Sequence, residues 1–562
     1  MSDWNFADVW ETVAAVLPDS PAQAWGPSGF TWSQFSARAD GVAQALLDAG
    51  LGHQDKVSQY LPNRPEYLES VFASFKAGMA PVNTNYRYTQ EELFYLWDNS
   101  DTAAVVFAGR FADRIEPVRS RLGLVRLWLW VHDGAGDCPP WAVPYEQAAS
   151  RFTTPGAARS QAGANGAAHP DLGGPVPRIG VQGPWGRSGD DLYMLYTGGT
   201  TGAPKGVMWR QDDLFASLNS TAALRYPDQG GLDDIGRQLV KPGPVNLPAC
   251  PLMHGTGAFA AFGALGAGGC VVTLPDLSFR AESLLDAIDA RKVKSIAIVG
   301  EAFAKPILAA LDEQPDRWDI SSLRVITSSG VMWSQANKDG LLRHNERLLL
   351  VDSYGSSEAV GVASSVTSSD NSAPTARFGL GVGTRVIDDD GHDVVPGSGQ
   401  IGMVAMSGRT PIGYYKDADK SRATFRVIGG QRYSVPGDFA SVEADGSLQL
   451  LGRGSVCINT GGEKVYPEEV EEVLKQHDHV ADAAAVGLPD DRFGQVICAV
   501  LEATAKGPAP DSVLIAHVQS HLADYKAPRR IVWLPSLSRG ANGKLDYNAL
   551  RDKAATAQGA SA

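Results

Sequence analysis

A segment rich in glycine and threonine, with a single lysine, constrains the fold of this chain more than any other part of its sequence. Residues 196–207 read Tyr-Thr-Gly-Gly-Thr-Thr-Gly-Ala-Pro-Lys-Gly-Val and follow a short apolar, aromatic run at 191–196. Such a run predicts a buried strand, so the glycines fall in a loop that leaves a sheet. Glycine lets backbone N–H groups approach anionic oxygens, and threonine hydroxyls and a lysine ammonium add further donors. The segment therefore predicts a polyphosphate-binding loop.

This loop differs from the common P-loop, in which a serine or threonine after the lysine binds magnesium. Here Lys205 is followed by Gly206. A plain glycine- and threonine-rich turn is the alternative, but the preceding strand and the lysine favour phosphate binding. The predicted phosphate-binding residues are Thr197, Gly198, Gly199, Thr200, Thr201, Gly202 and Lys205.

Length and charge limit the class of protein. With 562 residues, 44% of them hydrophobic and 20% charged, the chain is long enough for at least two globular domains. A formal net charge of −14 argues against a nucleic acid or an anionic membrane as a partner. Five cysteines form no C-x-x-C pair, so the sequence indicates neither a zinc site nor a disulfide framework.

Targeting signals are not apparent in the sequence. The most apolar window, Ala258–Cys270, is too short to span a bilayer. The first residues lack the basic start and apolar core of a signal peptide. We therefore expect a cytoplasmic protein without a transmembrane segment.

Amphipathic helices and short apolar strands alternate up to about residue 355. Residues 31–50 predict one such helix, which begins at Thr31 or Ser33 and ends at Gly50. Strands are predicted at 103–107, 270–274 and 295–299. This alternation indicates α/β layers with a largely parallel sheet.

The texture changes at about residue 380, where turns rich in glycine, aspartate and proline begin to separate short strands. This pattern predicts an antiparallel, barrel-like subdomain. Further on, Pro467 and the acidic residues after it predict the start of a new helix. We expect a large N-terminal domain over 1–452, a hinge at 453–456 and a small, mobile α+β domain over 457–562. Within the first domain, the low-complexity stretch 152–190 predicts a flexible insertion.

Several motifs occur in an order that resembles the adenylate-forming superfamily, which includes acyl-CoA synthetases, firefly luciferase and the adenylation domains of peptide synthetases. The resemblance runs from about residue 25 to about residue 550. It is closest to bacterial fatty-acid and steroid side-chain acyl-CoA synthetases. That closer match rests on Val207-Met-Trp-Arg210, Pro251-Leu-Met-His-Gly255, Gly413-Tyr-Tyr-Lys416 and Ile458-Asn-Thr-Gly-Gly-Glu-Lys464.

The resemblance implies an acid–thiol ligase that works in two steps. A carboxylate attacks the α-phosphate of Mg-ATP and gives an acyl-adenylate and pyrophosphate; the thiol of coenzyme A then displaces AMP. The active site must gather two anions and stabilise charge on the α-phosphorus, which is mainly a matter of positioning and electrostatics. The implied partners are a carboxylic acid, ATP, Mg²⁺ and coenzyme A.

A second motif, Asp352-Ser-Tyr-Gly-Ser-Ser-Glu358, is similar to the family's Tyr-Gly-x-Thr-Glu. The resemblance implies that Tyr354, followed by Gly355, stacks on adenine and that Ser357 contacts the α-phosphate. Glu358 is implied as the Mg²⁺ ligand, since this hard cation favours carboxylate oxygen. Taken alone, such a turn is also an ordinary loop. Ser329 and Gly330 match a segment that lines the adenine pocket.

The remaining nucleotide and coenzyme A contacts are implied near the C-terminal domain. Asp438, in a Pro-Gly-Asp turn, is implied to accept hydrogen bonds from both ribose hydroxyls, with Arg453 beside it. Lys544 matches the catalytic lysine that bridges the carboxylate and the α-phosphate. At the hinge, Ser455 stands where the family usually has aspartate or lysine. The coenzyme A tunnel is implied to be lined by Gly461, Gly462 and Lys464.

The resemblance implies that His254 gates or lines the acyl pocket, and that it belongs to the catalytic set with Thr201, Glu358 and Lys544. A lone histidine more often satisfies hydrogen bonds in a protein core. Small residues around it suggest room for a bulky apolar tail, such as a medium- or long-chain acid or a steroid with a carboxylated side chain. Glu301 would also allow a substrate with a hydroxyl or keto group. The expected lining is Phe259, Phe262, Gly263–Gly269, Gly300 and Glu301.

Two other functions stay open at this point. One is an enzyme that forms an acyl-adenylate and passes it to an acceptor other than coenzyme A. The other is a nucleotide-binding scaffold without catalytic activity. A homodimer is a further open possibility.

Overall fold

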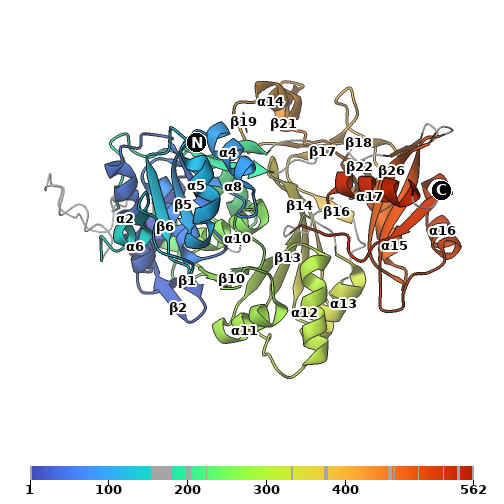
Figure 1. Cartoon of the computed structure of the whole chain (residues 1–562), viewed down its shortest axis with the longest axis horizontal. Helices are drawn as coiled ribbons and strands as arrows, with labels where there is room; N and C mark the ends of the chain where they lie inside the picture. Colours follow the sequence, from blue (N-terminus) through green and yellow to red (C-terminus); the bar gives the residue numbers. More distant parts are fainter. Residues whose placement is uncertain are drawn as a thin grey trace.

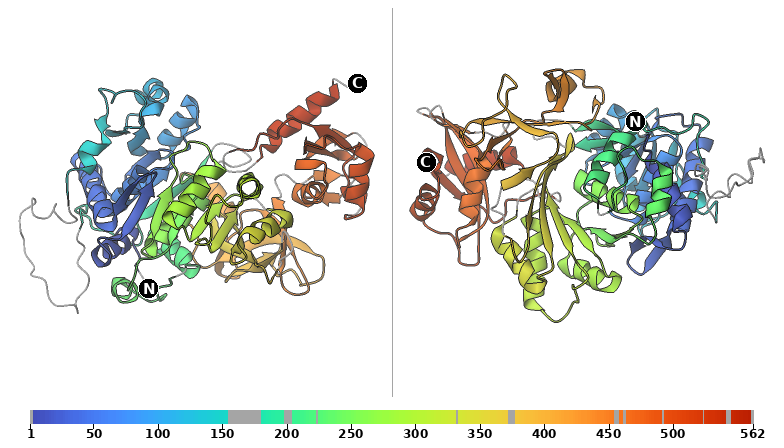
Figure 2. Two further views of the ribbon diagram at one scale, coloured as in Figure 1. Left: turned by 90° about the horizontal axis from the view of Figure 1, so that it is seen from below. Right: turned by 180° about the vertical axis from the view of Figure 1, so that it is seen from behind.

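The computed structural model describes residues 3–153, 180–197, 204–222, 224–330, 333–371, 377–453, 458–460, 463–490, 493–522, 524–540 and 545–559. Figures 1 and 2 show the chain running from an α/β region at one end, through a second sheet and a strand-rich region, to a small C-terminal part at the other end. This arrangement confirms the predicted fold class. No helix among the described residues is long and apolar enough to cross a bilayer.

The first sheet holds the phosphate-loop segment at one end. Its inner strands are parallel, whereas the pairs β8–β9 and β9–β19 are antiparallel. In order across the sheet, the strands are β19 (Gly413–Tyr414), β9 (Lys205–Arg210), β8 (Leu192–Thr197), β4 (Ala80–Asn83), β3 (Lys56–Tyr60), β5 (Thr102–Ala108), β6 (Leu127–Val131) and β7 (Val143–Pro144).

In the second sheet the strands from β1 to β14 are parallel, whereas the edge pair β2–β1 and the pairs from β14 onward are antiparallel. Its first part comprises β2 (Ser28–Thr31), β1 (Pro21–Trp25), β11 (Cys270–Thr273), β10 (Val245–Pro248), β12 (Ser295–Ile298), β13 (Val325–Ser329), β14 (Leu349–Ser356) and β15 (Ala359–Thr367). The barrel-like continuation comprises β16 (Arg377–Leu380), β23 (Leu448–Arg453), β22 (Asp438–Val442), β18 (Ile401–Ser407), β21 (Gln431–Ser434) and β20 (Phe425–Ile428), with β17 (Thr384–Ile387) paired to β18.

Helices cover these sheets and fill the space between them. They are α1 (Phe6–Val16), α2 (Trp32–Asp48), α3 (Pro65–Lys76), α4 (Gln90–Asn99), α5 (Ala112–Arg119), α6 (Tyr145–Ala149), α8 (Gln211–Ser220), α9 (Leu232–Gln238), α10 (Gly255–Gly266), α11 (Ala281–Arg291), α12 (Glu301–Glu313), α13 (Gln335–His344) and α14 (Ala418–Thr424). The predicted helix at 31–50 is α2, and Thr31 caps it through a reciprocal pair of hydrogen bonds with Gln34.

Aromatic side chains from three helices join the two sheets into one core. Phe6 of α1 stacks on Phe75 of α3, with 5.3 Å between the ring centroids. It also lies 5.3 Å from Phe262 of α10. Because α3 packs on the first sheet and α10 on the second, this cluster fixes how the sheets lie relative to each other.

A network of buried charges holds residues 180–187 against the helices. Lys76 Nζ lies 2.7 Å from Glu11 and 2.8 Å from Asp40, and Arg187 pairs with Glu11 and Asp8 at 2.8 and 2.9 Å. The sequence-based expectation of a flexible insertion over 152–190 is therefore wrong for 180–190. Buried ion pairs, which composition does not reveal, anchor this segment.

The C-terminal part has a sheet of its own, with two hydrophobic clusters on its faces. Its strands are β25 (Glu463–Val465), β24 (Ile458–Thr460), β27 (Gly494–Ala503), β26 (Val480–Asp490) and β28 (Arg530–Trp533), and its helices are α15 (Pro467–Lys475), α16 (Asp511–Gln519) and α17 (Tyr547–Gly559). The helix predicted from Pro467 is α15, which has this proline in its first turn.

Candidate active site

The predicted phosphate loop joins two antiparallel strands. β8 and β9 pair along their whole length, and Thr197 lies opposite Lys205 at the loop end of the hairpin. The middle of β8 is buried, as the sequence predicts. Unlike a P-loop, this loop returns as a strand and not as a helix. Its tip, with Gly198, Gly199, Thr200, Thr201 and Gly202, lies outside the described residues.

The ammonium of Lys205 is held by a carboxylate from a distant part of the chain. Its Nζ lies 2.6 Å from Oδ2 of Asp417. Asp417 also caps α14, because its side chain accepts a hydrogen bond from the backbone N–H of Lys420. The hydrogen bond from Lys205 lowers the pKa of Asp417 below its ordinary value. Asp417 is therefore an anionic neighbour of the loop that no sequence motif indicated.

Asn83 connects the phosphate hairpin to the predicted acyl side of the site. Its side-chain amide donates to the carbonyls of Tyr196 and Met253, at 2.9 and 2.7 Å, and its Oδ1 accepts from the N–H of Tyr196 at 2.6 Å. His254 follows Met253 directly and occupies the position before α10. One buried amide thus fixes the end of β8 relative to His254. Asn83 lies at the end of β4 and outside every motif, so the sequence did not indicate its role.

The second motif forms the turn between β14 and β15, and two hydrogen bonds attach that turn to the phosphate hairpin. The indole N–H of Trp209, on β9, donates to the carbonyl of Ser357 at 2.9 Å. The hydroxyl of Tyr414, on β19, donates to Oε1 of Glu358 at 2.8 Å. Since Glu358 is only 8% exposed, this bond satisfies one of its oxygens in a nearly buried place. Two motifs about 150 residues apart in the sequence therefore meet.

Residues before this turn support its backbone. Tyr354 is half-buried and packs near Phe378, with 5.9 Å between the ring centroids. At Gly355 an added Cβ would lie 3.0 Å from the carbonyl oxygen of Ala359, so the glycine allows the two strands to approach closely. Asp352, also part of the motif, forms a buried ion pair with Lys338. Burial raises the pKa of Asp352 although the charge of Lys338 opposes this shift.

The strand next to β14 carries the other predicted adenine-pocket residues. Ser329 of β13 lies in register with Ser353 of β14. Gly330 follows with φ +89°, in the left-handed region that favours glycine. The neighbouring Ser328 accepts a 2.9 Å hydrogen bond from the N–H of Gly300. The structure thus brings these residues and Tyr354 together at the carboxyl ends of two neighbouring strands, β13 and β14.

Asp438 lies on the barrel-like part of the second sheet. It begins β22, is 6% exposed, and pairs in register with Arg453 of β23. The two residues assigned to the ribose are therefore adjacent across two strands. The side chains of Arg453 and Lys464 lie outside the described residues, and so do Ser455, Gly461, Gly462 and Lys544.

Phe262, Gly263 and Gly266 of the expected acyl lining border one small recess of the structure. This apolar recess beside α10 has a volume of about 10 Å³, enough for about one water molecule. It is lined by Phe6, Phe215, Leu218, Asn219, Ala222, Leu224, Tyr226, Phe262, Gly263, Gly266 and Ala267. Phe259, Gly300 and Glu301, which also belong to the expected lining, do not border this recess.

The glycines of 263–269 serve different purposes, which explains the small recess. An added Cβ would contact Leu239 at Gly268 and the carbonyl of Pro244 at Gly269, so these two allow close packing. At Gly266 it would lie 3.4 Å from Phe215. Gly263 differs, because nothing lies within 4 Å of an added Cβ there. Within this run, Gly263 is the position that faces open space in the recess.

Glu301 does not supply a free polar group to an acyl pocket. Its carboxylate accepts hydrogen bonds from the backbone N–H of Ser334, at 2.5 Å, and from the side-chain amide of Asn337. It thereby ties the start of α12 to the start of α13. The idea that Glu301 recognises a hydroxyl or keto group of the substrate has no support in this geometry.

A profile described as AMP-binding enzyme matches residues 10–415, and one described as AMP-binding enzyme C-terminal domain matches residues 469–544. The chain belongs to the family of AMP-binding enzymes. The first match alone spans more than half of the chain.

Relatives of this AMP-binding enzyme extend over nearly its whole length. It is 37% identical to the 3-oxocholest-4-en-26-oate–CoA ligase of Rhodococcus rhodochrous, over 98% of this chain and 96% of the relative. It is 38% identical to a medium/long-chain-fatty-acid–CoA/3-oxocholest-4-en-26-oate–CoA ligase of Mycolicibacterium smegmatis, with the same coverage. The class inferred from the motifs, an acid–thiol ligase of the acyl-CoA synthetase type, is confirmed.

Solved structures support the fold of this AMP-binding enzyme. The anthranilate CoA ligase AuaEII in complex with anthranoyl-AMP matches with a TM-score of 0.80 at 21% identity, over 100% of this chain and 99% of that one. ATP-bound MatB from Rhodopseudomonas palustris matches with a TM-score of 0.76 at 23% identity, over 98% and 99%. At this level of identity the likeness concerns the fold.

Proposed function

We propose that this acyl-CoA synthetase activates a large apolar carboxylic acid, either a medium- or long-chain fatty acid or a steroid with a carboxylated side chain. The observation that carries this proposal is the similarity of 37–38% over nearly the whole length to ligases named for those acids. The apolar lining of the recess beside α10 supports it. Because that recess is small, the walls around Gly263 must move apart when the acyl chain enters.

The phosphate groups of ATP would lie at the loop end of the β8–β9 hairpin. Thr197 and Lys205 flank that end, and the glycines and threonines of the tip supply further donors. Lys205 would exchange Asp417 for a phosphate oxygen, since both offer an anionic acceptor to the same ammonium. Ser357, whose carbonyl is bonded to β9, would present its hydroxyl to the α-phosphate.

Adenosine would lie between the carboxyl ends of β13 and β14 and the barrel-like part. Tyr354 supplies an aromatic face, with Gly355, Ser329 and Gly330 at the same strand ends. Asp438 would accept hydrogen bonds from both ribose hydroxyls, because the oxygens of an ionised carboxylate act only as acceptors. Arg453 lies opposite Asp438 in the strand register and would bind the same sugar.

The donor set at the β14–β15 turn fits Mg²⁺. Glu358 offers a carboxylate at a turn bonded to the phosphate hairpin, and Tyr414 occupies Oε1 with a neutral donor. Hard cations prefer such oxygen ligands together with phosphate oxygens. When bound, the ion would neutralise charge on the phosphates of ATP. Tyr414 would orient the carboxylate that holds it.

The two half-reactions would use two positions of the C-terminal domain. Lys544 would bridge the carboxylate and the α-phosphate during adenylation, and the segment with Gly461, Gly462 and Lys464 would line the coenzyme A tunnel afterwards. The proposed hinge at 453–456 follows Gly452, whose φ of +104° is a glycine conformation. Glu468 of α15 comes so close to Gly452 that an added Cβ would overlap its carboxylate. We place the protein in the cytoplasm, consistent with the free thiols of the described cysteines.

A ligation screen tests this function. The purified enzyme is supplied with ATP, Mg²⁺, coenzyme A and one acid at a time, and AMP and acyl-CoA are quantified. We expect octanoate, longer fatty acids and 3-oxo steroid acids to give a much higher kcat/KM than acetate or benzoate. A preference for acetate or benzoate would overturn the substrate class. Adenylate formation without acyl-CoA for any acid would overturn the coenzyme A step.

A further inference from the structure

An unpaired strand edge lies on the barrel-like part, at β20 (Phe425–Ile428). β20 is the last strand of its sheet, and among the described strands it pairs with β21 alone. The two strands are joined by Gly429 and Gly430, which have φ of +58° and +82°. Positive φ at both turn positions gives a type I′ hairpin. The register of β20 is therefore fixed, with Ile428 opposite Gln431.

This register decides which backbone groups of β20 point outward. In an antiparallel pair, residues that exchange hydrogen bonds alternate with residues that do not. Ile428 flanks the tight turn, so its backbone groups bond to β21, and by alternation those of Arg426 do as well. The backbone of Thr424 follows the same alternation, because its carbonyl accepts a 2.7 Å hydrogen bond from the N–H of Val435. The N–H and C=O of Val427 therefore point to the free edge. The side chain of Val427 is 70% exposed.

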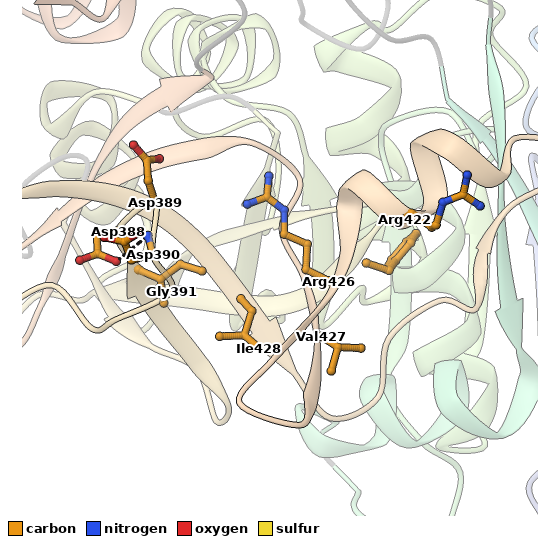
Figure 3. A pocket seen from close by; sticks show the side chains of 10 residues that line it. Asp388, Asp389, Asp390, Gly391, Arg422, Arg426, Val427 and Ile428 are labelled. Carbon is orange, nitrogen blue, oxygen red and sulfur yellow. Dashed lines mark hydrogen bonds between the residues drawn. The ribbon is translucent and has the colours of Figure 1, made fainter.

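Charges of both signs line a groove along this edge. The groove has a volume of about 500 Å³. Figure 3 shows Arg422 and Arg426 on one side and the acidic turn Asp388–Asp390 on the other. The Nε of Arg426 donates to the carbonyl of Ala423, and its two Nη groups make no hydrogen bond within the described part of the chain. The unpaired N–H and C=O groups of such an edge strand are a template for pairing with another chain.

We propose that β20 pairs with β20 of a second copy of this chain about a twofold axis at Val427. The surface is self-complementary, because a twofold operation brings the basic side of one copy to the acidic side of the other. The outward N–H and C=O of Val427 would bond to the same groups of the second copy. Its exposed side chain would then pack against its own counterpart.

The register places the charged side chains in contact. With Val427 opposite Val427, Arg426 lies opposite Ile428 of the second copy and on the same face of the joined sheet. The acidic turn packs on Ile428 at this face, since an added Cβ at Gly391 would lie 2.8 Å from Cγ2 of Ile428. Arg426 of each copy therefore reaches Asp388–Asp390 of the other. The symmetric interface contains this ion pair twice.

Sedimentation velocity over a range of protein concentrations measures the association. We expect the unmodified chain to pass from monomer to dimer as its concentration rises. Val427→Lys puts two like charges on the axis and should leave the chain monomeric, with its ligase activity unchanged. The control Val382→Lys alters a side chain that is 98% exposed elsewhere, and should dimerise normally. A monomer at every concentration, or a dimer that survives Val427→Lys, would overturn the proposal.

Charge reversal separates this interface from a folding defect. Arg426→Asp and Asp389→Arg should each weaken the dimer when studied alone. Mixed in equal amounts, the two variants should associate, because both ion pairs are then restored across the axis. A mixture that stays monomeric would contradict the assigned register. Binding of an unrelated protein at this edge, with no self-association, would also contradict it.

Cross-linking tests the position of the axis. Hydrogen-bonded antiparallel partners have Cα atoms about 5.5 Å apart, within the range that a disulfide spans. Val427→Cys should therefore give a covalent dimer on mild oxidation, seen on a non-reducing gel. Val382→Cys and the unmodified chain should not. If Val427→Cys gave no covalent dimer at concentrations at which sedimentation velocity detects the dimer, the twofold axis would not lie at Val427.

Discussion

The hydroxyl of Tyr414 donates a 2.8 Å hydrogen bond to Oε1 of Glu358. The two residues lie 56 positions apart, on β19 and in the β14–β15 turn. β19 is bonded to the phosphate hairpin, so this contact makes the proposed metal-binding carboxylate part of the same unit as the phosphate loop. The relationship gives Tyr414 a positioning role and leads to the first prediction.

Tyr414→Phe removes the donor and leaves the ring. A hydrogen bond to a charged group contributes about 1.5–3 kcal/mol, so we expect the Mg²⁺ concentration for half-maximal pyrophosphate release to rise about tenfold or more. Tyr415→Phe is the matched control, because its hydroxyl bonds to Asp101 instead. An unchanged Mg²⁺ requirement in Tyr414→Phe, or an equal change in both variants, would contradict the role of Tyr414.

We expect Asp417 to compete with the phosphates of ATP for Lys205, with which it forms an ion pair. Asp417→Asn keeps a side chain that can cap α14 but removes the charge. Partly exposed ion pairs contribute about 0–1 kcal/mol, so we expect the KM for ATP to fall by up to about fivefold. Lys205→Ala should instead raise this KM. Steady-state kinetics at varied ATP check both, and a higher KM in Asp417→Asn would show that the aspartate positions the lysine.

We expect Gly263 to limit the length of the acyl chain. Gly263→Leu would fill the open space beside it, and each methylene excluded from the pocket costs about 0.8 kcal/mol. We expect the preferred fatty acid to become shorter by about three or four methylenes, measured as kcat/KM over a series of unbranched acids. Gly236→Leu, at an exposed position of helix α9, is the control and should leave the series unchanged. The same preference in both variants would place the acyl chain elsewhere.

Lys544→Ala separates the half-reactions. Loss of one contact to developing charge should reduce acyl-adenylate formation by about 10²–10³-fold. Transfer from supplied acyl-adenylate to coenzyme A should continue at nearly the normal rate. The two steps are measured separately as pyrophosphate release and as acyl-CoA formation. Equal losses in both would refute the use of two domain positions.

Acid should weaken the buried charge network around Glu11. Burial alone would raise the pKa of Glu11, but Lys76 and Arg187 together lower it to about 2. The native state therefore gains stability above the ordinary pKa of 4.5, about 3 kcal/mol, and loses it as the pH falls from 4.5 towards 2. Glu11→Gln should lower Tm at pH 7 and show a smaller further loss below pH 4.5. Parallel Tm–pH curves for the two proteins would contradict this.

Local patterns predicted much of the fold, because strands and helices depend on nearby residues. The strand before the glycine-rich loop, the cap at Thr31 and the helix from Pro467 all follow from sequence spacing. The contacts of Asn83 and Tyr414 do not, because they join segments that only the folded chain brings together. Motif order implied that the segments meet, but it could not name the side chains that connect them.

Composition misled where one residue type serves two purposes. The glycines of 263–269 predict open space from the sequence. In the structure Gly268 and Gly269 allow close packing, and Gly263 alone of the run faces open space in the recess. Small polar residues in 152–190 suggested flexibility, although Arg187 lies fully buried among carboxylates. In both cases packing between distant parts of the chain decides the local structure, and the composition of the segment does not reveal such packing.

The same charge network suggests that the enzyme can be divided in two. Arg187 and the backbone of Val181 bind Asp8, Glu11 and Asp40, and β8 pairs with β4, so the chain after residue 180 is held firmly by the chain before residue 153. A backbone cut between those positions leaves all of these contacts in place. Two separately expressed fragments that divide the chain between residues 153 and 180, with no residue removed, should therefore reassemble into one ligase. Such a split enzyme would report when two attached proteins meet.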